Sequence, residues 1–261
     1  MDKTVDKVLT LIEALAMSAR PRGVTELARE LKLTKTNVHR LLQTLEKRGF
    51  VRRFADVGRY ELTLRLWEHA SRVPAFRNLK QEAGPFIAHL AQQTRETVHL
   101  SILEVFDVIY IDKIESSEPI RTYTQVGGRA PAYCNGTGKA MLAFKAPDYI
   151  QGLKGTLTRY TSTTITSIDA LMRELAKVRQ SGYAINRGEW HDGVYGIAAP
   201  VRDAAGQVIA AIGVSGPATR LKPKRLSAVI PNVMAAAEGI SRSLGFFGSS
   251  RDAAPPSKMK V

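Results

Sequence analysis

Seven hydrogen-bonding side chains without a carboxylate lie between residues 35 and 44. A helical period of 3.6 residues places them on one face, and they are Lys35, Thr36, Asn37, His39, Arg40, Gln43 and Thr44. Amide, imidazole and guanidinium groups of this kind pair with the edges of bases, and the cations among them also pair with phosphates. A solvated helix surface has a similar composition, so these residues alone leave groove recognition and a plain surface open.

Two sets of side chains could form a nucleophile with its partners: Cys134 with His99 or His191, and Ser215 with Glu189. The sequence has no nucleophile elbow, no cysteine or histidine pair at metal-ligand spacing and no glycine-rich phosphate loop. We therefore predict that the chain is not an enzyme and uses neither a metal nor a cofactor. Its single cysteine excludes an internal disulfide and agrees with a reducing compartment.

Gly136 and Thr137 stand where a helix over 135–144 is predicted to begin. Backbone N–H groups at a helix N-terminus have no intrahelical partner, and they attract anions. The glycine has a second explanation, because it also permits close packing of the helix against its neighbours. Both explanations stay open from these residues alone.

Net charge narrows the class of partner. The chain has 261 residues, of which 44% are hydrophobic, and a formal net charge of +14. This length favours two domains, and the excess of positive charge favours a polyanion, with nucleic acid before an anionic membrane. Nowhere do about 18 apolar residues follow one another, and the first residues lack a signal-peptide pattern, so we expect a cytoplasmic protein without membrane attachment.

The elements that position residues 35–44 follow from periodicity. Apolar residues recur at helical spacing over 6–19, 24–31 and 34–48, and Thr34 can cap the third helix. Strands are predicted over 50–54 and 59–62, joined by a turn at residues 55–58. This order of elements is typical of a winged helix-turn-helix.

Positive charge gathers in the same part of the chain. Residues 20–65 contain twelve arginines and lysines against five carboxylates, which is half of the excess of the whole chain. This concentration favours groove recognition by the third helix over a plain surface. Arg52, Arg53 and Arg59 in the wing strands are then expected on phosphates or in the minor groove.

The second half of the chain mixes helical and strand periodicity. A helical connector is predicted over 63–73, ending at Pro74, and a final helix over 222–244. The β-branched and apolar runs that predict strands are 97–103, 108–114, 120–126, 196–201 and 207–215. Because these strands and helices do not strictly alternate, they indicate an α+β domain with an antiparallel sheet.

The stretch GVTELARELKLTKTNVHRLLQTLEKRGFVRR resembles the DNA-binding half of IclR-type bacterial transcriptional regulators. In the second half, the matching stretches are ETVHLSILEVFDVIYIDKIES, residues 136–144, residues 189–201 and AAIGVSGP. The resemblance covers residues 2–245 and implies a winged helix-turn-helix followed by an effector-binding domain similar to the GAF fold. Lys32 stands where the family commonly has glycine, and a left-handed conformation there would cost about 1 kcal/mol.

The resemblance also implies an effector pocket. The residues that fall on or beside pocket positions of the family are Ala130, Gly136, Thr137, Asn186, Glu189, Val194, Gly196, Gly213 and Ser215. In the family, the segment at Gly136 contributes backbone amides to a carboxylate effector. Asn186 and Gly196 replace a frequent aspartate and a usual cysteine, and the small residues Ala130, Gly196 and Gly213 predict more room. We therefore expect an organic acid with an apolar or aromatic body.

The resulting hypothesis is a transcriptional regulator that binds double-stranded operator DNA and responds to a small organic-acid effector. The resemblance implies a homodimer or a dimer of dimers, that is, a homotetramer. Trp67, a large apolar residue in the connector, is expected to form part of the contact. A competing hypothesis is a GAF-like sensor or enzyme whose N-terminal domain has only an architectural DNA role. The predicted parts are a winged helix-turn-helix over 1–62, a linker helix over 63–74, a GAF-like domain over 75–245 and a disordered tail over 246–261.

Overall fold

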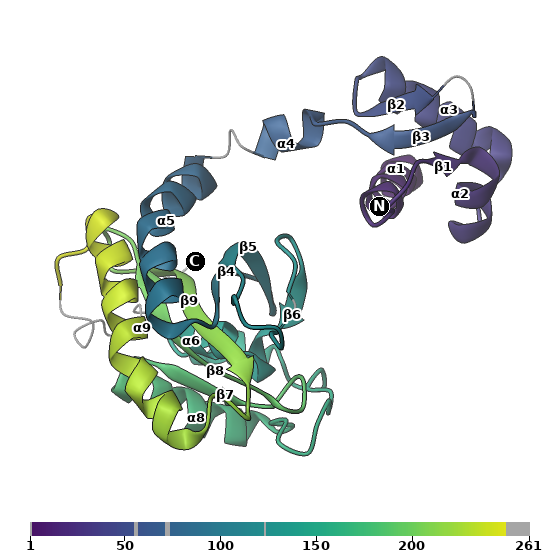
Figure 1. Cartoon of the computed structure of the whole chain (residues 1–261). Helices are drawn as coiled ribbons and strands as arrows, with labels where there is room; N and C mark the ends of the chain where they lie inside the picture. The colour runs from purple at the N-terminus through teal and green to yellow at the C-terminus, as the bar shows by residue number, and fades with distance from the viewer. Residues whose placement is uncertain (1, 55–56, 71–73, 123, 249–261) are drawn as a thin grey trace. The chain divides into compact units, whose positions relative to one another are not determined.

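Figure 1 shows the computed structural model, which describes residues 2–54, 57–70, 74–122 and 124–248. The chain divides into two compact units, Met1–Arg77 and Asn78–Val261. The finer division at residues 62, 74 and 245 stays a prediction. Of the predicted tail, residues 249–261 lie outside the described residues.

The N-terminal unit combines helices with a small sheet. Its helices are α1 (Lys3–Ala16), α2 (Val24–Glu30) and α3 (Lys35–Lys47). The strands β1 (Arg22–Gly23), β2 (Val51–Phe54) and β3 (Arg59–Leu62) pair antiparallel in the order β1-β3-β2. The predicted helix-turn-helix and wing strands are confirmed, while residues 55 and 56 of the predicted wing turn lie outside the described residues.

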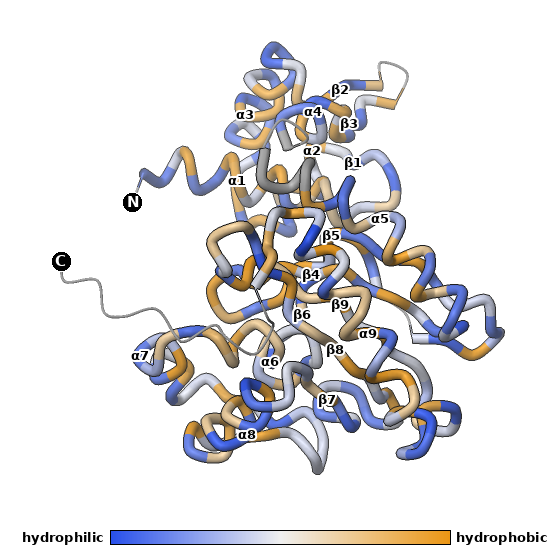
Figure 2. Tube along the Cα trace, turned by 90° about the vertical axis from the view of Figure 1, so that its left-hand side faces the viewer, coloured by the Kyte–Doolittle hydropathy of each residue, from blue (hydrophilic) through white to orange (hydrophobic). Residues whose placement is uncertain are grey.

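Local signals determine where α3 begins and which face it buries. The Thr34 side chain caps the helix by accepting a hydrogen bond from the N–H of Asn37 at 3.3 Å. Lys32, between α2 and α3, adopts a φ of 53°, the left-handed conformation that glycine would favour. Figure 2 shows hydrophobic and hydrophilic residues alternating along α1, the pattern of a helix with one buried face. Val38 and Leu42 of α3 are buried in the hydrophobic core of the N-terminal unit, so the polar face of α3 points away from that core.

Two helices lead into the second unit. These are α4 (Arg65–Ala70) and α5 (Pro74–Thr94), and α5 continues through Pro85. Burial of Ala83 and Ile87 against the sheet holds both sides of this proline in one helix. In the described part of the chain, no helix is long and apolar enough to cross a membrane.

The C-terminal unit is built around one antiparallel sheet. Its strands are β4 (Thr97–Glu104), β5 (Asp107–Ile114), β6 (Arg129–Pro131), β7 (Ala184–Arg187), β8 (Val194–Arg202) and β9 (Val208–Pro217). They pair in the order β6-β5-β4-β9-β8-β7. The predicted α+β class with an antiparallel sheet is therefore confirmed.

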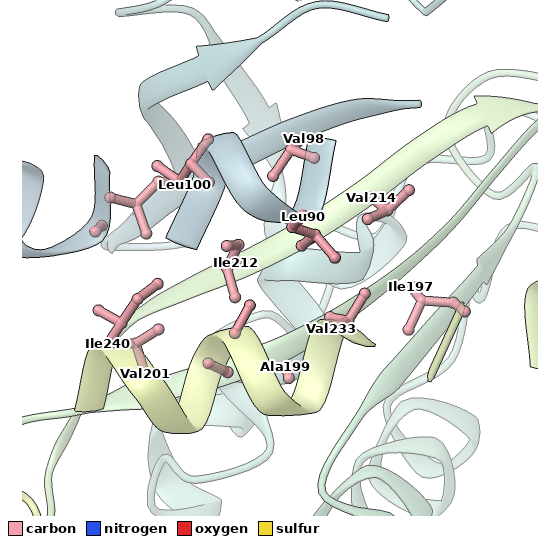
Figure 3. Close-up of a cluster of buried hydrophobic side chains, with 14 of the residues drawn as sticks. Leu90, Val98, Leu100, Ile197, Ala199, Val201, Ile212, Val214, Val233 and Ile240 are labelled. Carbon is pink, nitrogen blue, oxygen red and sulfur yellow. The ribbon is translucent and has the colours of Figure 1, made fainter. Parts of the chain in front are cut away.

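Helices cover both faces of this sheet. On one face, α5 and α9 (Pro223–Ser243) pack on the strands; Figure 3 shows Val233 and Ile240 of α9 against Val201 and Ile212 of the sheet. The other face carries the 3₁₀ turn η1 (Ala132–Cys134) and the helices α6 (Gly136–Leu142), α7 (Pro147–Gln151) and α8 (Ile168–Ser181). Because strand side chains alternate, each of β8 and β9 supplies residues to both cores.

The strand predicted over 120–126 is wrong, because the described residues of that range are irregular. Side-chain hydrogen bonds take the place of a backbone ladder there. Thr122 Oγ1 lies 2.8 Å from Ser215 Oγ, and Thr124 Oγ1 lies 3.3 Å from His99 Nδ1. Thr122 and Thr124, two of the β-branched residues that suggested a strand, therefore form polar contacts to the sheet.

Candidate functional site

The polar face of α3 is largely free of contacts with the rest of the N-terminal unit. Five of its predicted DNA-binding residues are exposed, namely Lys35, Thr36, His39, Arg40 and Gln43. Asn37 is half-buried, and its Oδ1 atom has no hydrogen-bond partner in the described structure. The face is therefore open to an external partner, and its role in base contacts stays a prediction.

The three predicted wing arginines differ in how far they are already engaged. Arg52 forms an ion pair with Glu61 across β2 and β3. Arg59 donates to the carbonyl oxygen of Pro21 at 3.1 Å and lies 3.3 Å from a carboxylate oxygen of Glu26. Arg53 is exposed and forms no ion pair with any residue the structure describes. Of the three, Arg53 has the guanidinium most available to a phosphate.

A cavity of about 400 Å³ lies within the C-terminal unit, on the face of the sheet that carries α6. Residues of β4, β5, β7, β8 and β9 line it, together with the start of α6, residues 120–122, Thr124 and residues 190, 191 and 193. This volume falls in the range of about 300–1,000 Å³ that is usual for small-molecule pockets. The cavity is therefore a candidate binding site.

Seven of the nine predicted effector residues line this cavity. They are Gly136, Thr137, Asn186, Val194, Gly196, Gly213 and Ser215. Ala130 is instead buried in the apolar core beneath α6, where β6 pairs with β5. Glu189 is buried against Lys139, with its Oε1 atom 2.5 Å from Nζ, so its side chain faces a lysine instead of the cavity. The cavity thus brings most of the predicted set together and leaves these two out.

A polar network that the sequence analysis missed crosses the cavity lining. His99 Nε2 lies 2.6 Å from Ser215 Oγ, which also contacts the Thr122 hydroxyl. Burial, with a smaller effect from the charge of Lys113, lowers the pKa of His99 to about 4, so the imidazole is neutral at pH 7. Period-2 alternation in the strand at 97–103 placed His99 on one face with Ser101, but nothing local showed that this face lines a cavity.

The start of α6 uses its own groups to satisfy its backbone. Asn135 Oδ1 accepts hydrogen bonds from the Thr137 N–H at 3.0 Å and from the Thr137 hydroxyl at 2.9 Å. Asn135 Nδ2 in turn donates to the Tyr110 hydroxyl at 2.8 Å, and burial raises the pKa of that hydroxyl to about 12. Of the two amides predicted to hold a carboxylate, the one at Thr137 therefore already has an acceptor.

The small residues were expected to enlarge the pocket, but Gly196 and Gly213 do not do so. A Cβ atom at Gly213 would lie 2.9 Å from Thr137 Cγ2 and 3.0 Å from Ala198 Cβ. At Gly196 it would lie 2.7 Å from the carbonyl oxygen of Val214. Neighbouring atoms thus fill the space that larger side chains would need, and the cavity owes its size to other parts of its lining.

The nucleophile sets considered above do not assemble. Burial raises the pKa of Cys134 to about 12, which keeps the thiol protonated. Ser215 contacts His99, but a threonine hydroxyl lies at the other ring nitrogen, where a catalytic histidine has a carboxylate to orient it. Among the described residues, no group of three or more histidine, cysteine, aspartate or glutamate side chains could hold a metal ion.

Comparison with known families identifies the family of this chain. Residues 73–242 match the model of the bacterial transcriptional regulator IclR C-terminal domain, and residues 4–54 match that of the IclR helix-turn-helix domain. The chain belongs to the IclR family. As in other members of the family, an N-terminal helix-turn-helix DNA-binding domain precedes a C-terminal effector-binding domain.

Individual relatives agree with this assignment. The chain is 36% identical to the HTH-type transcriptional regulator KdgR of Escherichia coli K12 over 245 residues, covering 93% of each chain. It is 30% identical to the transcriptional repressor IclR of the same strain, over 93% of this chain and 90% of the relative. These IclR-family relatives are named as regulators and a repressor, which fits a protein without enzymatic activity.

A solved IclR homologue from Microbacterium hydrocarbonoxydans is similar to the whole chain. Its TM-score is 0.84 at 28% identity, and the similarity covers 93% of this chain and 99% of that one. That structure is a complex with 4-hydroxybenzoate. The fold of this IclR-family chain is thus the fold of a protein that binds an aromatic acid.

Proposed function

We propose that this IclR-family regulator binds a specific operator through α3 and the wing, and that a small organic acid in the C-terminal cavity controls this binding. The observation that carries the proposal is the cavity of about 400 Å³, which contains seven residues predicted from the family's pocket. Its volume exceeds what a two- or three-carbon acid fills, and a relative of the same fold holds an aromatic acid. The protein acts without a cofactor.

The DNA-binding part of the proposal makes a prediction about two arginines. Arg40→Ala on α3 should weaken binding to the selected operator by about 1–3 kcal/mol, because a base contact is lost, and should leave binding to random DNA nearly unchanged. Arg53→Ala in the wing should weaken binding to both DNAs alike and flatten its salt dependence, because a phosphate contact is lost. Sequences enriched from a random library by the wild-type protein provide the operator for titrations at several salt concentrations.

Arg129→Ala is the control, because Arg129 is an exposed arginine of the C-terminal unit that pairs with Asp107. It should leave both affinities unchanged. Equal losses on operator and random DNA for Arg40→Ala would contradict base contact by α3.

We also propose that the protein is a homodimer or a dimer of dimers. Trp67 in α4 and Leu64 directly before it are large apolar residues with 68% and 76% of their surfaces exposed. If the interface buries Trp67, Trp67→Ala should weaken self-association roughly tenfold, or by about 1.4 kcal/mol. Sedimentation across micromolar concentrations measures it, with the similarly exposed Val105→Ala as the control; a monomeric wild type would refute the proposal.

A further inference from the structure

Segment 115–122, together with Thr124, forms what we term the strap, and it is tied to the sheet by polar contacts. At its start, the Ser116 hydroxyl donates to the carbonyl oxygen of Arg95 at 2.7 Å. Further along, Arg220 donates from Nη1 to the carbonyl oxygen of Ile120 at 2.7 Å, while its other nitrogens pair with the buried Glu96. The strap therefore holds a defined position beside the cavity, and Ile120, Arg121 and Thr122 line it.

Arg121 differs from every other lining residue in its charge. Within the described lining it is the only lysine or arginine. Its Nε atom lies 3.2 Å from Glu115 Oε2, which orients the side chain, and neither Nη atom has a partner among the residues described. A guanidinium with two free terminal nitrogens suits a carboxylate, which it can bind through two parallel hydrogen bonds.

The sheet residues of the lining offer hydrogen bonds without charge. His99 is neutral, and its Nε2 atom shares a hydrogen bond with the Ser215 hydroxyl. Both groups can donate or accept, so they suit a hydroxyl or a carbonyl oxygen. A carboxylate gains no ion pair from them, and at the start of α6 it would have to displace Asn135 from the Thr137 N–H.

We propose that the effector's carboxylate binds the guanidinium of Arg121 on the strap, while a neutral hydroxyl or carbonyl group of the same effector binds the His99–Ser215 pair on the sheet. This inference rests on the proposed function, since it assumes that the cavity takes an organic acid. It narrows the effector to a hydroxylated or oxo acid. It also assigns to the strap the charge recognition that the resemblance placed at the start of α6.

The first experiment tests the carboxylate site with matched probes. The acids 4-hydroxybenzoate, gluconate and lactate are titrated calorimetrically into the full-length protein, each beside its uncharged amide. Arg121→Gln should weaken binding of every acid that binds the wild type by tenfold or more, as expected for loss of a charge-assisted pair, and should leave amide binding unchanged. Arg121→Lys should restore part of the preference for acid over amide, and Arg129→Gln is the matched control.

The second experiment tests whether the His99–Ser215 pair binds the neutral group of the effector. Each acid is compared with its counterpart lacking hydroxyls: benzoate, hexanoate and propionate. Wild type should prefer the hydroxylated acid, and His99→Phe should remove that preference while the preference for acid over amide remains. Thr122→Val, which removes a hydroxyl 2.8 Å from Ser215 Oγ, gives a second test of the network if the His99 variant does not fold.

The outcomes separate this inference from the proposed function. If acids bind but Arg121→Gln keeps the wild-type preference for acid over amide, the inference is overturned and the proposed function stands. The same holds if neither variant of the network alters discrimination by hydroxyl groups. If none of the acids binds the wild type, the proposed control by a small organic acid fails, and the inference fails with it.

Discussion

Replacing Lys139 with methionine should destabilise the C-terminal unit by about 3–5 kcal/mol, because the change leaves a buried carboxylate without its partner. Lys139 is fully buried in α6. Its Nζ atom donates to Glu189 Oε1 at 2.5 Å and to the carbonyl oxygen of Ile185 at 2.7 Å. Urea unfolding followed by circular dichroism measures the loss, and Lys177→Met, which removes an exposed lysine 3.9 Å from Glu174, should cost less than about 0.5 kcal/mol.

The cost of Lys139→Met should also depend on pH. Burial raises the pKa of Glu189, and the charge of Lys139 opposes that rise. Without the lysine, the pKa of the folded-state carboxyl rises further above its value in the unfolded chain, so the folded variant binds the proton more tightly. Its stability should therefore be greatest below the unfolded-state value of about 4.5 and fall as the pH rises through the folded-state pKa.

Unfolding curves at pH 5 and pH 8 test this dependence. The difference in the free energy of unfolding between wild type and Lys139→Met should be larger at pH 8, because more of the unpaired Glu189 carboxyl must ionise there. The double variant Lys139→Met, Glu189→Met should regain most of the lost stability and lose the pH dependence of this difference. An equal difference at both pH values would show that Glu189 does not carry the effect.

Gly138→Ala should destabilise the same unit by about 3 kcal/mol or more, since the added methyl group has no space. A Cβ atom there would lie 2.2 Å from the carbonyl oxygen and 2.4 Å from the Cα atom of Ala132, which are backbone atoms of η1. Backbone cannot rotate aside as a flexible side chain can, so α6 would have to move away from η1. At about 2–4 °C per kcal/mol for a unit of this size, the melting temperature should fall by about 6 °C or more.

Gly84→Ala is the matched control within α5. Apart from its chain neighbours, a Cβ atom at Gly84 would meet no atom within 4 Å. Alanine favours the helix over glycine, but a Cβ atom directly before Pro85 crowds the proline ring. Because these two local effects oppose each other, this variant should unfold within a few degrees of the wild-type temperature. Equal melting temperatures for Gly138→Ala and wild type would mean that α6 and η1 do not pack this closely.

The sequence by itself determined the DNA-binding unit almost completely. Helical periodicity and the Thr34 cap are signals that lie within a few residues of the structure they specify. The wing strands were predictable for the same reason, since β2 and β3 are neighbours in the chain. Resemblance to the family added the effector-binding domain and seven of the cavity residues.

The tertiary structure alone decided the chemistry of the cavity. His99 and Ser215 are 116 residues apart, and they meet because β4 pairs with β9 in the middle of the sheet. The tertiary structure also showed that Glu189 faces Lys139. The strap lines the cavity, although its β-branched residues are typical of a strand. Residue type and spacing report on local backbone conformation, whereas the pairing of distant strands depends on how the whole chain buries its apolar surface.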